Sequence, residues 1–447
     1  MEYLSDGLTV NLINSLTDLR QVSVKSRSSA FRYKGRADDP QVAGRELGVG
    51  GVLTGSLSRR EDLLVVAAEL VETHTGNQVW GGQFSRKATD LFALEDEISR
   101  SIVSTLALRL TAEQERRLSR RYTDNIEAYH LHLQGSFHAA TFREEGLRRA
   151  IDYYRRALAL DPNYALAYTG LAHAYFWFTD WYAPSKEVSP LAIEAARKAL
   201  EIDEGLADAH GMLALVTLIY AWNWPAAENE FLRALELDPA NARVRAYYAW
   251  LLVALGREER AVAEAGRAQQ SESLSAEVHC VAGLVLYLAR RNELAVAAEL
   301  RAIELDPNFT WAYLTMGRAL LAQGRLGDAL PRLERARMLE PTLPEALAAL
   351  GGAQAVAGKK SAAQASLEEL ARLAGQRHVA PFDFATLHAA LGEWDRAMDW
   401  LEKAYLERSY LMPSMGVLPE LDGLRDEPRF QALLRRMELP QSTGPGY

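Results

Sequence analysis

Three short stretches of this chain hold residue types that can do chemistry. Gly48-Val49-Gly50-Gly51 has the glycine content of a loop whose backbone N–H groups cradle a phosphate. His130, His132 and His138 are imidazoles that could ligate a metal ion, and Cys280 is the one thiol of the sequence. Whether any of these residues forms a site depends on the spacing between them.

The spacing does not favour a catalytic or metal centre. The glycine stretch opens a predicted strand and lacks the Gly-Lys-Ser/Thr of a phosphate loop, so we interpret it as a turn. His130 and His132 are two residues apart, whereas helical side chains that converge are three or four apart. The lone Cys280 excludes an internal disulfide and a cysteine-based metal site. We therefore predict no enzymatic activity, no metal and no cofactor in these 447 residues.

Small residues recur every 34 residues through the second half of the chain. One series is Ala227, Ala261, Ala295, Ala329 and Ala363, and a second is Gly283, Gly317 and Gly351. A helix-stop tripeptide marks the same period at Leu237-Asp238-Pro239, Leu305-Asp306-Pro307 and Leu339-Glu340-Pro341. Two helices pack 8–10 Å apart only where their contact residues are small. The pattern resembles the tetratricopeptide repeat, a helix-turn-helix unit, and predicts a mostly α-helical solenoid.

The predicted solenoid extends over residues 124–407 and contains about eight helix pairs. The expected units are 125–160, 163–203, 206–237, 240–270, 275–305, 309–339, 343–373 and 381–407. The second unit is lengthened by an insertion from Thr179 to Pro190, which is rich in aromatic residues. Residues 408–447 are expected to form a capping segment followed by a frayed tail.

Residues 1–121 follow a different pattern, which predicts a small α/β module. A helix is expected after Ser5-Asp6-Gly7, with its apolar stripe running from Leu8 to Leu19. The other expected elements are a strand at Gln21–Ser26, a helix from Asp39-Pro40 to Leu47, strands at Val49–Ser58, Leu63–Glu72 and Gln78–Phe84, and a helix at Asp90–Leu110. Short polar turns join the last three strands, so we expect two antiparallel hairpins.

The amino-terminal residues also resemble a known module. The strings that carry the resemblance are Tyr3-Leu4-Ser5-Asp6-Gly7-Leu8-Thr9, Ser29-Ala30-Phe31-Arg32-Tyr33-Lys34-Gly35, Gly44-Arg45-Glu46-Leu47-Gly48-Val49 and Leu91-Phe92-Ala93-Leu94-Glu95-Asp96-Glu97-Ile98. They are similar to the TolB/FlgO-like module, which precedes tetratricopeptide repeats in bacterial signalling proteins. That module begins with an apolar strand that has no counterpart here, so the resemblance implies an amino-terminally truncated chain.

Composition limits the classes of partner. The net charge is −9 and no basic stripe stands out, which argues against nucleic acid as a partner of this chain. The longest apolar stretches, such as Met212 to Tyr220, are well short of the ~20 residues that span a membrane. We expect a cytoplasmic protein, or a periplasmic one if a membrane span lies upstream. The oligomeric state is left open.

The first helix of each repeat lines the concave groove in this kind of solenoid, and that register selects candidate partner-binding residues. They are His173, Trp177, Trp250, Tyr287, Trp311 and Arg318. A groove that clamps a peptide carboxylate would present Lys, Arg and Asn, so we expect an apolar or aromatic-anchored partner segment. The alternative is that the same side chains pack in the core.

Three hypotheses of function follow from the repeats and the resemblance. The first is a non-enzymatic protein-interaction and sensing scaffold of a bacterial signalling protein, which binds a partner segment on the concave face. The second is the regulatory portion of a serine/threonine kinase or adenylate cyclase whose catalytic domain lies upstream. The third is the effector portion of a winged-helix transcriptional regulator. Only the sequence upstream of Met1 separates them.

Overall fold

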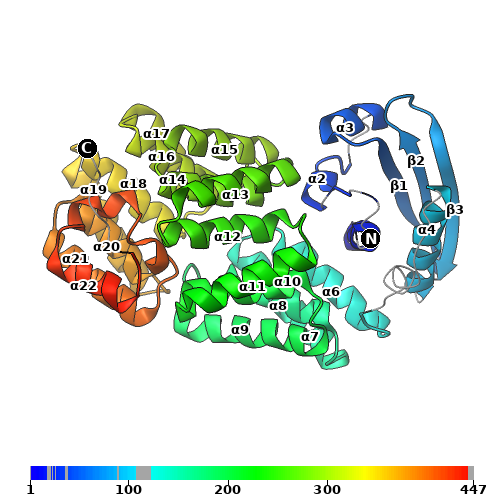
Figure 1. Ribbon diagram of the computed structural model, residues 1–447, viewed down its shortest axis with the longest axis horizontal. Helices are drawn as coiled ribbons and strands as arrows, with labels where there is room; N and C mark the ends of the chain where they lie inside the picture. The colour runs from blue at the N-terminus through cyan, green and yellow to red at the C-terminus, as the bar shows by residue number, and fades with distance from the viewer. Residues whose placement is uncertain are drawn as a thin grey trace. The chain divides into compact units, whose positions relative to one another are not determined.

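The computed structural model describes residues 2–440 except 18–21, 23, 26, 36–38, 88–89 and 107–121 (Figure 1). The chain divides into two compact units. The first is Met1–Ala167 with Glu272–Leu274, and the second is Tyr168–Ser271 with Ser275–Tyr447. The boundary falls within helix α8, Ala165–Phe176.

The first unit combines a three-stranded sheet with helices. Its strands are β1 Gly51–Arg60, β2 Leu63–Glu72 and β3 Gln78–Lys87, and its first helices are α1 Glu2–Thr17, α2 Arg27–Phe31, α3 Pro40–Leu47 and α4 Leu91–Thr105. The strands are antiparallel in the order β1-β2-β3, as the two predicted hairpins require (Figure 1). Helix α3 begins where predicted, because the Asp39 side chain accepts a hydrogen bond from the backbone N–H of Gln41.

Two expected elements of this unit differ in the structure. Helix α1 begins at Glu2 rather than after Ser5-Asp6-Gly7, because its buried stripe already starts at Leu4 and continues through Leu8. The strand predicted at Gln21–Ser26 lies half outside the described residues, and its described members Val22, Val24 and Lys25 take no strand conformation. The predicted end of the following long helix, residues 107–110, also lies outside the described residues.

Helix pairs make up the rest of the described chain. In order they are α6 Ile126–Ala139 with α7 Glu144–Leu160, α8 with α9 Ser185–Ile202, α10 Ala207–Val216 with α11 Trp224–Leu237, α12 Ala242–Ala254 with α13 Glu258–Ser271, α14 Ala276–Leu288 with α15 Asn292–Leu305, α16 Thr310–Ala322 with α17 Leu326–Leu339, α18 Pro344–Val356 with α19 Lys360–Ala374, and α20 Pro381–Ala390 with α21 Trp394–Glu407. This confirms the mostly α fold of consecutive helix pairs. The π-helix η2, Thr217–Ala221, extends α10. Helices α6 and α7 belong to the first compact unit, whereas the sequence assigned them to the solenoid. The domain boundary at residues 121–124 therefore stays a prediction.

The small residues of the repeat let the two helices of a pair approach closely. A Cβ atom added to Gly317 of α16 would lie 2.6 Å from Cγ and Cδ2 of Leu333 in α17. Ala329, one repeat after Ala295, is fully buried in the same pair. The repeat glycine is therefore required by the close approach of α17 and not by an unusual backbone angle.

Replacing Gly317 by alanine should lower the free energy of unfolding by about 1–3 kcal/mol, because Leu333 must shift to admit the methyl group. Gly266 is the matched control, since it lies inside helix α13 and a Cβ atom added to it would enter open space. Gly266→Ala should raise stability by about 0.5–1 kcal/mol. Urea denaturation followed by circular dichroism measures both, and equal midpoints would contradict the assigned register.

A buried carboxyl group lies within the preceding helix pair, α14 and α15. Glu299 of α15 is fully buried, and its carboxyl group lies beside the Cys280 thiol. Burial raises the pKa of Glu299 well above its usual value. Burial and the neighbouring Glu299 also raise the pKa of Cys280, so this thiol stays protonated and packs as a small apolar group.

The raised pKa of Glu299 makes stability depend on pH. Because the folded-state pKa lies above the unfolded value of about 4.3, the group stabilises the fold fully only below that unfolded value. This stability is lost as the pH rises through the folded pKa. The free energy of unfolding of Glu299→Gln, relative to that of the wild type, should therefore rise by up to about 1.4 kcal/mol per pH unit across this window. Urea midpoints at pH 5 and pH 8 measure the gap, and a constant gap would refute the prediction.

Candidate functional site on the inner face of the repeats

Five residues form a ladder along the second unit. Each is the second residue of the first helix of a repeat, 34 or 35 residues after the one before, and these first helices pack side by side. The members, in order, are Asp208, Arg243, Glu277, Trp311 and Glu345. We call the surface that they mark, together with the facing residues of the same helices, the inner face.

The chain itself covers part of the inner face. Residues 409–425, called the strap here, follow α21 and contain two short 3-10 helices, η3 Met412–Ser414 and η4 Pro419–Leu424. The last helix, α22 Pro428–Arg436, comes after the strap. Seven large apolar side chains of the strap are buried: Tyr410, Leu411, Met412, Met415, Leu418, Leu421 and Leu424. Burial of each such side chain contributes roughly 1.5–3 kcal/mol to holding the strap in place.

Polar groups of the strap pair with side chains of three successive first helices. Trp250 of α12 donates its indole N–H to the Ser414 hydroxyl at 2.8 Å. Tyr287 of α14 donates its hydroxyl to Glu420 Oε2 at 2.5 Å, and Arg318 Nε of α16 lies 3.2 Å from Glu420 Oε1. These three residues are among the candidates predicted from sequence, and all three are buried. Each one contacts the strap.

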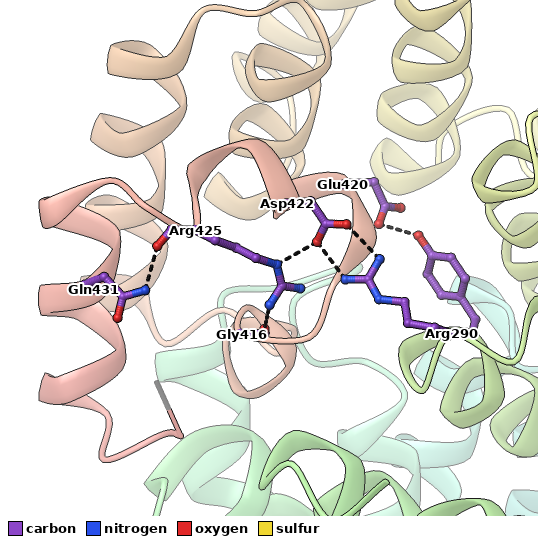
Figure 2. Close-up of polar contacts among 7 residues, drawn as sticks. Arg290, Gly416, Glu420, Asp422, Arg425 and Gln431 are labelled. Atoms are coloured by element: carbon purple, nitrogen blue, oxygen red, sulfur yellow. Dashed lines mark hydrogen bonds and ion pairs between the residues drawn. The ribbon is translucent and has the colours of Figure 1, made fainter. Parts of the chain in front are cut away.

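The second carboxylate of the strap, Asp422, lies between Arg290 and Arg425, as Figure 2 shows. Arg290 Nη1 and Nη2 donate to the two oxygens of Asp422, at 2.9 and 2.6 Å. Arg425 braces the strap from within, because its Nε donates to Asp422 at 2.7 Å and its Nη1 donates to the Gly416 carbonyl at 2.5 Å (Figure 2). Two-pronged arginine–carboxylate pairing fixes orientation as well as position.

Glu345 accepts three hydrogen bonds from side chains of other segments. It is buried and accepts hydrogen bonds from Arg318 Nη1 at 2.7 Å, from the Trp181 indole at 2.8 Å and from the Tyr410 hydroxyl at 3.0 Å. The donors come from a repeat helix, from the insertion after α8 and from the strap. Glu345 therefore joins three segments that are far apart in the sequence.

The insertion after α8 supplies the aromatic part of this region. The Trp181 ring lies 4.6 Å from Trp311 and 4.5 Å from Tyr410, measured between ring centroids. Trp177 stacks on Trp181 at 5.4 Å and contacts Trp311 at 6.0 Å. The predicted candidates Trp177 and Trp311 are thus buried against each other and against the insertion.

Acidic groups outnumber basic groups behind the strap. Asp180 accepts a hydrogen bond from the Tyr410 backbone N–H at 3.0 Å and pairs with His378 at 3.0 Å. Asp383 of α20 is also buried. Burial, followed by the charges of Glu345 and Asp180, raises the pKa of Asp383 well above its usual value. Asp383 is therefore protonated in conditions where an exposed aspartate is charged.

The first three ladder residues lie outside these strap contacts and are polar. Arg243 pairs with Asp208 at 3.0 Å, and Tyr247 donates its hydroxyl to Glu277 at 2.7 Å. Partial desolvation opposes the ionisation of Asp208, but the Arg243 guanidinium and the Asn241 amide together lower the pKa of this carboxyl group. The side chains of Asp208 and Arg243 are 44% and 33% exposed, so this part of the inner face is open to solvent.

The sixth predicted candidate, His173, lies at this open part. Its Nε2 accepts a hydrogen bond from the Trp177 indole at 3.2 Å and is 3.7 Å from Glu277 Oε1. The sequence marked Trp181 as part of the aromatic insertion, where a local core was the favoured interpretation, but it did not single out Glu345, Ser414, Glu420 or Asp422. Glu345 could have been found by its position in the repeat, whereas the strap residues follow no periodic pattern.

The other residues with possible chemistry do not converge. His132 lies among the rings of Tyr154 and Tyr164, and His138 stacks on Tyr153. Within the described ranges, no group of three or more His, Cys, Asp and Glu side chains is placed to hold a metal ion. None of the helices in those ranges is long and apolar enough to cross a membrane.

Comparison with known proteins agrees with the repeat fold. Residues 299–330 match the family model described as "Tetratricopeptide repeat". The chain is 32% identical over 216 residues to "Putative adenylate cyclase 3" of Rhizobium meliloti (strain 1021), which covers 48% of this chain and 37% of that relative. It is 26% identical over 140 residues to "Transcriptional regulator HilA" of Salmonella typhimurium, covering 31% of this chain and 25% of that relative.

A solved structure of Pseudomonas aeruginosa pilF is 25% identical, with a TM-score of 0.36, and covers 47% of this chain and 91% of that chain. The present chain spans well under half the length of the curated relatives that it matches. The protein is a tetratricopeptide-type helical solenoid with a small antiparallel sheet near its amino terminus. Solenoids of this type are protein-interaction scaffolds.

Proposed function

We propose that this chain is a non-enzymatic interaction and sensing scaffold of a bacterial signalling protein, and that it binds a partner segment on the inner face. The partner is a protein or peptide. The observation that carries the proposal is that the inner face already accommodates a peptide segment, the strap, through side chains of successive repeats. A surface that pairs with one segment in this way has the shape and the donors to pair with another.

We expect the partner to bind first at the solvent-exposed part of the ladder. Asp208 and Arg243 are half-exposed and are held in place by each other and by Asn241, which donates to Asp208 at 3.0 Å. Preformed polar groups lose little side-chain freedom when a partner binds them. A partner segment would engage this part first and continue toward Trp311.

A second candidate function is the regulatory portion of an adenylate cyclase. The specific observation in its favour is the 32% identity over 216 residues with the Rhizobium meliloti relative. In this alternative the partner of the inner face is a cyclase catalytic domain. The match to HilA similarly keeps the effector portion of a transcriptional regulator as a third candidate.

Site-specific photo-crosslinking tests the scaffold function. A photoreactive phenylalanine analogue would replace Asp208 on the inner face or, as a matched control, Leu232 on helix α11 of the same repeat. Both positions are accessible to solvent, since the Asp208 side chain is 44% exposed and Leu232 is an exposed apolar residue. In cells of the source organism we expect a discrete protein adduct from position 208 and none from 232. Identical adducts from both positions, or none from 208, would contradict the proposal, and an adduct containing a cyclase catalytic domain would favour the second candidate.

A further inference from the structure

The strap has the properties of a bound ligand. Its polar contacts to the inner face are made by side chains that lie 133 and 164 residues away in sequence, Tyr287 for Glu420 and Trp250 for Ser414. Its conformation is two short 3-10 helices of three and six residues joined by irregular backbone, which resembles a docked peptide more than a repeat helix. The strap therefore reports which chemistry the inner face recognises.

The recognised chemistry has a definite order along the strap. An aromatic ring, Tyr410, packs on Trp181, and a hydroxyl four residues later accepts from Trp250. Two carboxylates follow, Glu420 at Tyr287 and Arg318, then Asp422 at Arg290. Each strap carboxylate thus meets an arginine of the repeats, with Glu420 sharing Arg318 with Glu345, and these two arginines favour carboxylates at this end of the bound segment.

We propose that the strap is an internal competitor, and that the partner of the inner face is an acidic segment carrying an aromatic residue, a hydroxyl residue and two carboxylates at the spacing of Tyr410, Ser414, Glu420 and Asp422. This inference rests on the proposed scaffold function. The partner displaces the strap and takes over its contacts to Trp250, Arg318 and Arg290.

The competition is unequal because the strap is covalently attached. A tethered segment is present at an effective concentration in the millimolar range, so it lowers the apparent affinity of a free competitor by roughly 10²–10⁴-fold. The part of the strap that can open first is η4, since the Asp422 side chain is 48% exposed and its partner Arg290 is 36% exposed. Weakening this end should expose the arginines while Tyr410 and Ser414 stay bound.

The test uses the full chain and a synthetic peptide of residues 409–425 with a fluorescein label. The strap is loosened in the protein by Glu420→Gln with Asp422→Asn, which keeps shape and removes both charges. By fluorescence anisotropy we expect the peptide to bind the loosened protein at least tenfold more tightly than the wild type. Equal binding to both proteins, or no binding to a loosened protein that is folded by circular dichroism, would overturn the inference.

Two controls separate specific from general binding. A peptide with the same two substitutions should bind the loosened protein at least tenfold more weakly than the natural peptide, because each charge-assisted bond to an arginine is lost. Arg290→Gln, added to the loosened protein, should weaken the binding of the natural peptide to a similar degree. Unchanged affinity in either control would overturn the recognition of an acidic segment.

Hydrogen exchange on the wild-type protein provides a second measurement that needs no variant. Backbone amides of the strap, such as Leu418, which donates to the Ser414 carbonyl, should exchange through local opening. We expect them to exchange at least tenfold faster than buried amides of α14. Strap amides that exchange as slowly as those of α14 would show a permanently closed segment and would overturn the inference, whereas the photo-crosslinking at position 208 would still test the scaffold function.

Discussion

Replacing Trp311 by alanine is expected to lower the free energy of unfolding by about 3–5 kcal/mol. The ring is buried against Trp177 and Trp181, and alanine would leave a cavity between the repeat helix α16 and the insertion. Thermal and urea denaturation measure the loss. This is the result expected of a residue that packs in the interior of the second unit.

The half-exposed Trp394 is the matched control for Trp311. Trp394→Ala removes the same atoms from a side chain that is 45% exposed, so its loss should be clearly smaller. If Trp311→Ala instead stays within about 1 kcal/mol of the wild type and abolishes partner binding, the core role is wrong. Trp311 would then be an anchor of the binding surface, as the sequence register proposed.

The second large effect is expected from removing the charge of Arg318. Its guanidinium is buried between Glu345, at 2.7 Å, and Glu420, at 3.2 Å. Arg318→Met keeps much of the volume but leaves the Glu345 carboxylate without its charged partner. Breaking a buried pair from one side costs about 3–5 kcal/mol, and urea denaturation should show a loss of that size.

A double variant shows whether the loss comes from the unpaired charge. Glu345→Gln added to Arg318→Met removes the buried negative charge, while the amide oxygen can still accept from Trp181 and Tyr410. The double variant should recover at least half of the lost stability. If the two losses simply add, Arg318 acts through its packing and not through its charge.

The sequence by itself determined the repeats and the hairpins. Alanine and glycine at a period of 34 mark where the helices of a pair touch, as the contact between Gly317 and Leu333 shows. These contacts lie within one repeat, so local spacing is enough to predict them. The same holds for β2, whose bounds Leu63–Glu72 follow from the turns on either side.

The register also selected six inner-face residues, but it could not say what covers them. Trp250, Tyr287 and Arg318 contact the strap, Trp177 and Trp311 contact the insertion, and His173 lies at the open part. An aromatic or arginine side chain at a given helical position is equally suited to an open groove and to a buried contact. Their role in partner binding stays a proposal.

Only the tertiary structure decided the occupant of the inner face. Contacts that hold it join residues far apart in the sequence, such as Tyr287 with Glu420 and Trp250 with Ser414, which are 133 and 164 positions apart. The strap consists of turns and two short 3-10 helices, so it has neither the 3.6-residue nor the two-residue period that marks an α-helix or a strand. Hydrogen bonds between such distant groups form only after the repeats have stacked and brought their donors to one surface.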